Sequence, residues 1–353
     1  MATEQAIKQA LSTIIDPDFN KDIVSLGFVK DIHIEGRRAS VTIELTTPAC
    51  PVKESFRQQA EQAILALDDI DSVDVKMTSR TSTPRREGIP GIANIIAVAS
   101  GKGGVGKSTT TVNLAVAMAR TGARVGLLDA DIYGPSIPRM MHLADLRPQV
   151  RNKRLQPLQN YGVKTISIGF LVDENQAAIW RGPMVSGAVM QLLKDVDWGE
   201  LDYLFIDLPP GTGDIHLTLA QNVPMSGAVV VTTPQDIALL DARRGIAMFD
   251  KVHIPTLGLV ENMSVFICPH CGESSHIFAK DGADKLSAQT EVPLLAKIPL
   301  DIRIRQDADA GTPVVVSAPD SEPARLYLDL AGKVARRVSV LNQRKVDIPV
   351  TDG

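Results

Sequence analysis

Hydrophobic and polar residues follow a changing pattern along the chain, and the change falls near residue 80. Before it, short alternating and helical patterns succeed one another over a length that suits a small domain. We expect a helix at 4–15, strands at 28–35 and 38–46, a helix at 52–67 and a strand at 72–77. These elements predict a small α+β domain over residues 1–80.

A break in the pattern follows this first domain. The stretch beyond residue 79 is polar, basic and interrupted by Pro84, Pro90 and glycines. That composition is typical of a linker. We therefore place a linker at residues 81–92 and a second domain at residues 93–353.

From Ala93 onward, uninterrupted apolar runs alternate with helical patterns. Such strands must be covered on both faces, and helical crossovers provide that cover. The apolar runs are residues 95–99, 125–128, 204–206, 229–232 and 257–260, with a helix after Lys107. The second domain is therefore predicted to be α/β, with a mostly parallel sheet flanked by helices.

A last helical pattern, residues 323–341, places Leu330, Val334 and Val338 among Lys333 and two arginines. Two interpretations fit this pattern. We expect a terminal helix that docks on the sheet, and the alternative is a basic amphipathic helix that lies on a membrane surface.

Composition narrows the class of protein. The chain has 353 residues, of which 44% are hydrophobic and only 4% aromatic, as in an aliphatic α/β enzyme. A net charge of −4 argues against a protein that mainly binds the phosphate backbone of nucleic acid. The N-terminus lacks the features of a secretory signal, and no apolar stretch approaches the length of a membrane span. We therefore expect a cytoplasmic protein without stable membrane association.

The strongest functional signal lies after the first strand of the second domain. That strand leads into a glycine-rich loop and then a helix, which is the context of a phosphate-binding loop. The loop consists of Gly101, Lys102, Gly103, Gly104, Val105, Gly106, Lys107, Ser108 and Thr109. Glycines bring backbone amides close to phosphate oxygens at the positive end of the helix. We expect Lys107 to reach the β- and γ-phosphates of ATP and the Ser108 hydroxyl to bind Mg²⁺; a turn without nucleotide is the alternative.

Lys102 narrows the class further, because an ammonium directly after the first glycine is not needed to hold phosphate within one subunit. The sequence GKGGVGKST resembles the deviant Walker A family, which includes the nitrogenase iron protein and the Min- and Par-type ATPases. In that family this lysine reaches across a dimer interface to the partner's nucleotide. The resemblance implies a homodimer with two ATP molecules between its subunits; a solvated loop charge is the alternative.

Three acidic residues end apolar strands, where ligands bind in open α/β sheets. Asp129 and Asp131 follow one strand, and Asp207 follows another. By similarity to the family, Asp131 orients the attacking water, Asp129 supports the Mg²⁺ site and Asp207 holds Mg²⁺ through water. The resemblance thus implies a slow ATPase with Lys102, Lys107 and Asp131 as its catalytic residues. A helix cap or turn is the alternative for the two earlier acids.

Two further residues complete the nucleotide site that the resemblance implies. The loop after Asp207 resembles switch II, with the Gly211 amide available to the γ-phosphate. Asn262 follows a strand at a place where the family has an asparagine that hydrogen-bonds adenine. An amide offers the donor and the acceptor that a purine edge requires, although a turn asparagine is the alternative.

A cysteine pair, Cys268 and Cys271, lies in the sequence CPHCG shortly after Asn262. The proline and glycine bend the backbone so that both thiolates point at one ion. Zinc and iron–sulfur clusters normally have four ligands, and the sequence contains no second CxxC. Two copies across a twofold axis supply four thiolates, which is the assembly that Lys102 also implies. A zinc site with His276, a redox dithiol and two incidental thiols are the alternatives.

The combination of SGKGGVGKS, DLPPGTGD and ENMS followed by CPHCG resembles the Mrp/ApbC group of iron–sulfur carrier ATPases over nearly the whole chain. The resemblance implies that a homodimer transfers a bridging 4Fe-4S cluster to apo iron–sulfur proteins, with cluster scaffold proteins as further partners and no nucleic acid. The alternatives are a Min- or Par-type positioning ATPase acting on membrane or DNA, and a zinc-binding regulatory NTPase.

The first domain resembles the small module of iron–sulfur assembly factors. The resemblance rests on Asp16-Pro17-Asp18 and on the run LTTPACP that contains Cys50. In that module Cys50 is a candidate transient ligand, and the start of the next helix is expected to favour its thiolate. A buried structural cysteine is the alternative.

Overall fold

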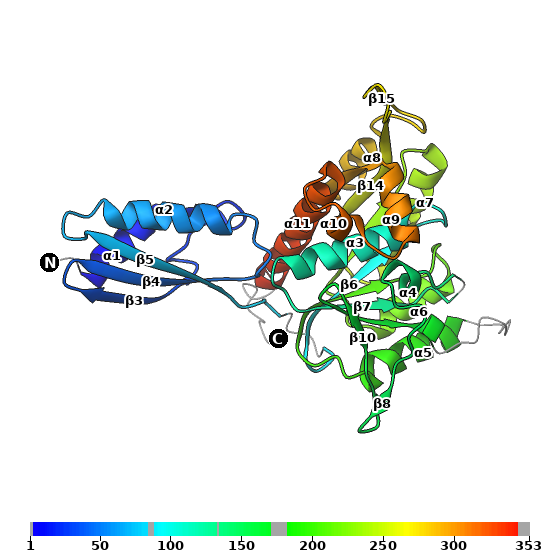
Figure 1. Cartoon of the computed structure of the whole chain (residues 1–353), viewed down its shortest axis with the longest axis horizontal. Helices are drawn as coiled ribbons and strands as arrows, with labels where there is room; N and C mark the ends of the chain where they lie inside the picture. The colour runs from blue at the N-terminus through cyan, green and yellow to red at the C-terminus, as the bar shows by residue number, and fades with distance from the viewer. Residues whose placement is uncertain (1–2, 84–87, 133, 171–181, 345–353) are drawn as a thin grey trace, which may run out of the picture. The chain divides into compact units, whose positions relative to one another are not determined.

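The computed structural model describes residues 3–83, 88–132, 134–170 and 182–344 (Figure 1). Two compact units divide the chain: an N-terminal unit, Met1–Thr83 with Ala335–Gly353, and a P-loop unit, Pro84–Val334. Part of the expected linker, residues 84–87, lies outside the described residues, as do Tyr133 and the chain beyond residue 344.

The N-terminal unit contains a three-stranded sheet covered by two helices. Its strands are β3 (Val29–Glu35), β4 (Arg38–Leu45) and β5 (Ser72–Ser79), with β1 (Ile15–Asp16) and β2 (Lys21–Asp22) as a separate short pair. β3 pairs with β4 antiparallel, and β4 pairs with β5 parallel. Alternate residues of β4 are buried and share one core with α1 (Glu4–Leu11) and α2 (Lys53–Leu65). The predicted α+β domain is therefore present.

The P-loop unit is built on a mostly parallel sheet, which confirms the predicted fold class. Within the described residues the sheet has nine strands in the order β10-β11-β7-β12-β6-β13-β14-β15, with β16 also paired to β14. Only β10 and β15 pair antiparallel to their neighbours. The strands are β6 (Ile92–Ala99), β7 (Val125–Asp129), β10 (Leu158–Asn160), β11 (Val163–Ser167), β12 (Leu201–Asp207), β13 (Gly227–Thr232), β14 (Thr256–Ile267), β15 (Ser274–Ser275) and β16 (Leu294–Leu300).

Helices cover both faces of this sheet, which explains why its central strands are almost entirely apolar. One face packs on α5, α6, α7 and α8, whose side chains join the main core, and α3, α10 and α11 lie on the other face (Figure 1). The helices are α3 (Lys107–Arg120), α4 (Ile137–Met140), the 3₁₀ helix η1 (Ile168–Phe170), α5 (Gly182–Asp195), α6 (Asp214–Asn222), α7 (Asp236–Lys251), α8 (Gly282–Thr290), α9 (Ile302–Asp309), α10 (Val314–Ser317) and α11 (Glu322–Arg344).

The last helix docks as expected. Its apolar residues Tyr327, Leu330 and Val334 are fully buried, so this stripe is not available to a membrane surface. Among the described residues, none of the helices is both long enough and apolar enough to cross a bilayer.

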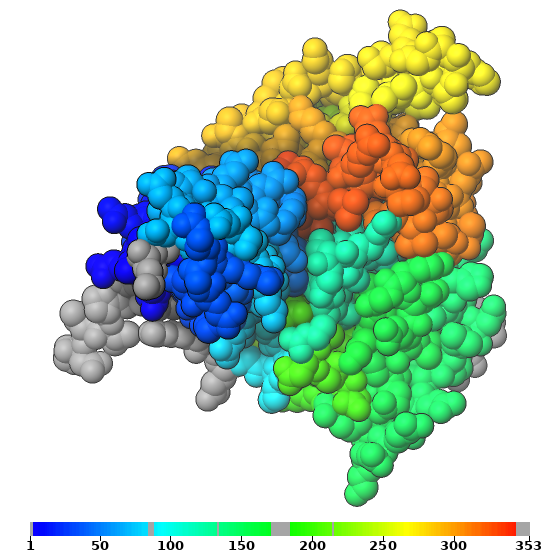
Figure 2. Space-filling view, turned by 60° about the vertical axis from the view of Figure 1, so that its left-hand side comes forward, coloured from blue at the N-terminus to red at the C-terminus, as the bar shows by residue number. Residues whose placement is uncertain are grey.

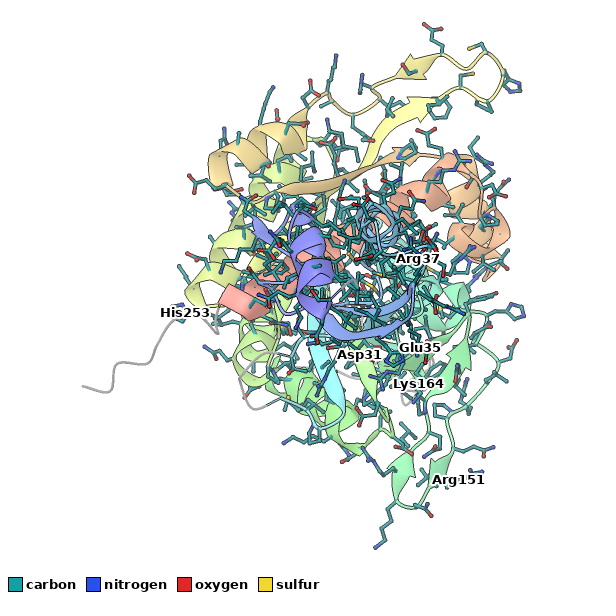
Figure 3. The ribbon with its side chains drawn as sticks, turned by 90° about the vertical axis from the view of Figure 1, so that its left-hand side faces the viewer. Asp31, Glu35, Arg37, Arg151, Lys164 and His253 are labelled. Atoms are coloured by element: carbon teal, nitrogen blue, oxygen red, sulfur yellow. The ribbon has the colours of Figure 1, made fainter. Side chains whose placement is uncertain are left out.

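A small hairpin extends from the P-loop unit beyond its sheet. It pairs β8 (Val150–Arg151) with β9 (Arg154–Leu155), and Arg151 lies on its projecting arm (Figure 3). Arg154 ties the base of the hairpin to the sheet domain by donating to the carbonyl oxygen of Val196 at 2.7 Å. The hairpin thus presents basic side chains on a chain of net negative charge.

Candidate active site

The phosphate-binding loop connects β6 to α3, and two of its glycines are required by close approach of other elements. A Cβ at Gly101 would lie 2.3 Å from the carbonyl carbon of Asp241 on α7. A Cβ at Gly106, where φ is +80°, would lie 2.2 Å from the Asn262 side-chain nitrogen. The loop is therefore packed between α7 and the Asn262 side chain of β14, and only glycine fits at these two places.

Lys107 and Asp207 form a buried ion pair at the centre of the site. The Lys107 Nζ lies 2.6 Å from one Asp207 carboxylate oxygen and 3.7 Å from an Asp131 oxygen. Asp207 also accepts hydrogen bonds from the hydroxyls of Ser108 at 2.6 Å and Thr111 at 2.7 Å. Lys107 is 6% exposed and Asp207 is 0% exposed. The charges therefore compensate each other away from water.

Asp129 lies beside Asp207 because β7 and β12 pair in that register. It accepts hydrogen bonds from the Ser167 hydroxyl on β11 at 2.9 Å and from the amide of Asp131 at 3.1 Å. Burial, together with the neighbouring Asp207 carboxylate, holds the pKa of Asp129 well above its usual range. The oxygens of two crowded carboxyl groups, close to the Ser108 hydroxyl, suit a divalent cation such as Mg²⁺, whose charge would favour their ionised forms.

Lys102 and the expected switch II loop are linked through Ser100. The Gly211 amide donates to the Ser100 carbonyl oxygen at 2.9 Å, and the Ser100 hydroxyl donates to the Lys102 carbonyl oxygen at 2.9 Å. The Lys102 ammonium lies 3.5 Å from the Gln235 amide oxygen. A contact between the Gly211 amide and a γ-phosphate therefore requires that its bond to Ser100 break.

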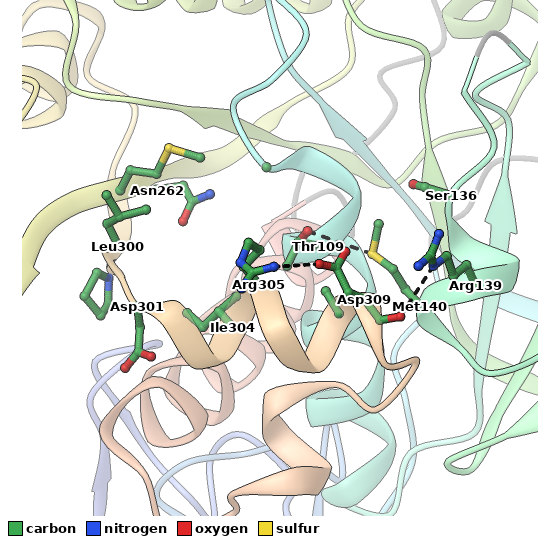
Figure 4. Close-up of a pocket in the computed structure, with 14 residues that line it drawn as sticks. Thr109, Ser136, Arg139, Met140, Asn262, Leu300, Asp301, Ile304, Arg305 and Asp309 are labelled. Atoms are coloured by element: carbon green, nitrogen blue, oxygen red, sulfur yellow. Dashed lines mark hydrogen bonds and ion pairs between the residues drawn. The ribbon is translucent and has the colours of Figure 1, made fainter. Parts of the chain in front are cut away.

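A cavity of about 280 Å³ adjoins the phosphate-binding loop, and Asn262 is among its lining residues (Figure 4). The Asn262 amide nitrogen donates to the Val105 carbonyl oxygen at 2.9 Å. A second hollow of about 220 Å³, lined by Lys107, Ser108 and Asp131, shares Gly106 and Thr109 with the first cavity. A base and its phosphates can therefore lie in adjoining spaces.

The sequence patterns missed several residues of this site. Ser167 and Thr111 fix the two buried carboxylates, and the cavity walls include Leu300 of β16 and Ile304 and Arg305 of α9 (Figure 4). Thr111 lies one helical turn beyond Lys107, so helical spacing was a usable signal for it. The other four are brought in from distant segments and carry no local signal.

The cysteine pair lies in a protruding loop between β14 and β15, drawn in yellow (Figures 1 and 2). The Cys268 amide donates to the Glu273 carbonyl oxygen and the Gly272 amide to the Cys268 carbonyl oxygen, both at 2.9 Å. Amide hydrogen bonds from Cys271 and His270 to the Cys268 sulfur lower the pKa of its thiol. In the part of the chain that the structure describes, no third histidine, cysteine or carboxylate joins this pair, so His276 does not complete a site.

Cys50 lies in the turn before α2, as expected, but its thiolate is not favoured. Burial raises the pKa of Cys50 to about 11, because desolvation penalises the charged form. The nearby carboxylates of Asp16 and Asp18 act in the same direction. The amide of Val52, at the start of the helix, does favour the thiolate as expected, but burial outweighs it.

Comparison with known families decides the assignment of the chain. The family described as NUBPL iron-transfer P-loop NTPase matches residues 91–335. The chain belongs to this family. The family described as iron–sulfur cluster assembly protein matches residues 4–77, within the N-terminal unit. Both matches agree with the resemblance seen in the sequence motifs.

Individual relatives agree with this assignment. Proteins named iron–sulfur cluster carrier protein include one from Synechocystis, 48% identical over 96% of this chain and 99% of that protein. Another, from Escherichia coli, is 49% identical over 87% of this chain and 85% of that protein. The predicted family is therefore confirmed.

Solved structures agree on the fold of the P-loop unit. A nucleotide-binding protein from Archaeoglobus fulgidus in complex with ADP is 41% identical, with a TM-score of 0.57 over 63% of this chain and 88% of that chain. The cell division ATPase MinD of Pyrococcus furiosus is 26% identical, with a TM-score of 0.54 over 68% of this chain and 98% of that chain. The chain is a P-loop ATPase.

Proposed function

We propose that this protein is an ATP-hydrolysing carrier of iron–sulfur clusters that binds one cluster between two subunits and passes it to apoproteins. The observation that carries the proposal is the exposed loop with Cys268 and Cys271, in which backbone amides lower the pKa of the Cys268 thiol. A thiolate is the form that binds iron. One subunit supplies two thiolates, so a homodimer supplies the four that a 4Fe-4S cluster takes.

The nucleotide site supports ATP hydrolysis with Mg²⁺. Ser108, Asp207 and Asp129 would hold the cation, directly or through water, since they present oxygen ligands at neighbouring positions. The cation supplies charge that neutralises the phosphate oxygens. Lys107 binds the β- and γ-phosphates, and Asp131 orients the attacking water.

The remaining site residues place the triphosphate and the second subunit. The amides of Gly101, Gly103 to Val105 and Thr109 surround the phosphates, Gly211 senses the γ-phosphate, and Asn262 binds the base. Lys102 reaches the nucleotide of the partner subunit.

The proposed function assigns a role to each domain of the chain. Residues 1–80 form an assembly-type domain, residues 81–92 a linker and residues 93–353 the ATPase domain, although the structure groups Ala335–Gly353 with the N-terminal unit. The partners are apo iron–sulfur proteins and cluster scaffold proteins, met in the cytoplasm.

Anaerobic reconstitution with iron and sulfide tests the proposal. We expect visible cluster absorption, four iron and four sulfide per two chains, and a dimer by native mass spectrometry. Cys268→Ala and Cys271→Ala should lose the cluster, whereas Cys50→Ala should keep it. A wild-type protein that binds only zinc would contradict the proposal. So would a variant without Cys268 and Cys271 that takes up the same iron and sulfide.

A further inference from the structure

Four consecutive residues of β14, Glu261 to Ser264, line the cavity beside the phosphate-binding loop or contact the segment that follows the cysteine loop, residues 276–283. The inner two, Asn262 and Met263, line the cavity. The outer two, Glu261 and Ser264, accept hydrogen bonds from the segment that follows Cys271. One short stretch of backbone is therefore shared by both sites.

The outer contacts are made by two residues that follow the cysteine loop, His276 and Ala283. The buried Glu261 carboxylate accepts a hydrogen bond of 2.7 Å from the amide of Ala283, in the first turn of α8. The carbonyl oxygen of Ser264 accepts a hydrogen bond of 3.2 Å from the His276 ring, whose Nδ1 is therefore the donor. The Ser264 hydroxyl in turn donates to the carbonyl oxygen of Ile298 on β16 at 3.1 Å. The segment that follows the cysteine loop is thus bonded at two residues to β14, the strand from which the loop begins.

The backbone between these contacts is bent at the cavity wall. Between Asn262 and Phe266 β14 advances four positions, whereas β16 advances two, from Ile298 to Leu300. Met263 adopts a φ of +56°, in the left-handed region that residues with side chains rarely occupy. Such a bulge re-aims the strand, and its conformation depends on the groups around it.

A nucleotide base in the cavity would change those surroundings. The Asn262 amide donates one of its two hydrogens to the Val105 carbonyl oxygen at 2.9 Å, and a base would add partners to its other hydrogen and its oxygen. Met263 lines the same space, so its side chain must accommodate the base. Both changes, at Asn262 and at Met263, act between Glu261 and Ser264, which accept hydrogen bonds from the segment that follows the cysteine loop.

We infer that the segment Glu261–Ser264 transmits nucleotide occupancy to the cysteine loop, and that Glu261 is a positioning residue for the cluster-binding thiolates. The inference rests on the proposed function, because it takes Cys268 and Cys271 as cluster ligands. By linkage, bound cluster changes nucleotide affinity by the same factor by which nucleotide changes cluster affinity. Glu261 is expected to set this coupling factor, and not the affinity for nucleotide alone or for cluster alone.

The test measures this factor in the dimer loaded with cluster. Cluster affinity is measured by equilibrium competition with an iron chelator, with and without a non-hydrolysable ATP analogue, and the analogue's Kd is measured with and without cluster. Wild type should show a ratio within the usual range of coupling, about 5- to 150-fold. Glu261→Ala should bring both ratios to within about twofold of one, with the analogue's Kd for cluster-free protein changed by less than about threefold.

Glu261→Gln is the conservative variant, because its amide oxygen can accept the Ala283 hydrogen bond. Burial raises the pKa of Glu261, so an uncharged side chain suits this place. Lys297, Asp281 and Asp284 are the charged groups around it. Glutamine should restore most of the coupling, and Glu200→Ala, at an exposed position of the same unit, should leave it unchanged.

The outcomes separate this inference from the proposed function. A wild type that binds no cluster contradicts the proposed function itself. A loaded wild type with no nucleotide effect, or a Glu261→Ala protein with the wild-type ratio, contradicts only the inference. If Glu261→Ala does not fold, Met263→Gly decides, since glycine relieves the φ of +56° and should reduce the ratio; an unchanged ratio there overturns the inference.

Discussion

Neutralising one member of the Lys107–Asp207 pair should destabilise the nucleotide-free protein, and neutralising both should recover most of the loss. The two charged atoms are 2.6 Å apart, and the side chains are 6% and 0% exposed. In Lys107→Met, Asp207 keeps the hydroxyl donors Ser108 and Thr111 but has no cation beside it. The negative charge of Asp207 then lies buried next to Asp129.

The size of the effect follows from the burial of the pair. Removing one partner of a buried ion pair costs about 3–5 kcal/mol. Two hydroxyl hydrogen bonds of about 1 kcal/mol each remain on Asp207, so we expect the lower end, about 3 kcal/mol. In Lys107→Met/Asp207→Asn the amide oxygen accepts from the same hydroxyls, and neither side chain of the pair carries a charge. The double variant should therefore unfold within about 1 kcal/mol of wild type.

Urea unfolding followed by tryptophan fluorescence measures this difference, because Trp180 and Trp198 are the chain's only tryptophans and both belong to the P-loop unit. The Lys297–Asp284 pair is a matched control, with the same 2.6 Å separation but side chains 40% and 47% exposed. Its double-variant cycle should give a coupling below about 1 kcal/mol. A Lys107→Met protein as stable as wild type, or a double variant no more stable than the single one, would refute the reasoning.

Three further predictions concern single side chains. Asn262→Ala should weaken ATP binding about tenfold in isothermal titration, because about 1.4 kcal/mol of hydrogen bonding to the base is lost; an unchanged Kd would remove Asn262 from the base site. Lys102→Ala should keep ATP binding within about threefold but lower hydrolysis at least about 100-fold, since a cation supplied by the partner is missing; full turnover by a monomeric variant would contradict this. Cys50, with a pKa of about 11, should be alkylated at pH 8 about 100-fold more slowly than an ordinary thiol. Between pH 9 and 11 the unfolded chain loses the Cys50 proton before the folded chain does, so the free energy of unfolding should fall over this range. Cys50→Ser should flatten that fall.

The fold was predictable where a strand is uninterrupted and apolar. β6, β12 and β13 sit between neighbours and under helices on both faces, so burial determines nearly every residue and the pattern is visible in the sequence. β16 was missed because Lys297 and Pro299 interrupt its apolar run. The full length of β14 was missed because it continues through the bulge at Met263, which depends on pairing with β16.

The candidate site was predictable in its local parts. Glycines and Lys107 follow one another in the phosphate-binding loop, and each acid ends a strand, so chain order alone places them at one edge of the sheet. Register between strands is not local, and it is register that sets Asp129 beside Asp207. The burial that raises the pKa of Cys50 likewise comes from residues distant in sequence.

Three contacts within the chain use groups that the proposed function assigns to ATP. Lys107 binds Asp207, the Gly211 amide binds the Ser100 carbonyl oxygen, and the Asn262 amide binds the Val105 carbonyl oxygen.

On the proposed function, binding ATP exchanges partners at the phosphate loop and at switch II, and it adds a base to the Asn262 amide. The exchange at Lys107 is the most constrained, because moving this cation to the phosphates leaves the Asp207 carboxylate without compensation, buried beside Asp129. A divalent cation restores the balance, so Mg²⁺ and ATP should bind with strong positive coupling. The exchange at Gly211 changes the hydrogen bonding of switch II, and the contact at Asn262 changes that of β14. Nucleotide binding therefore acts directly on both segments.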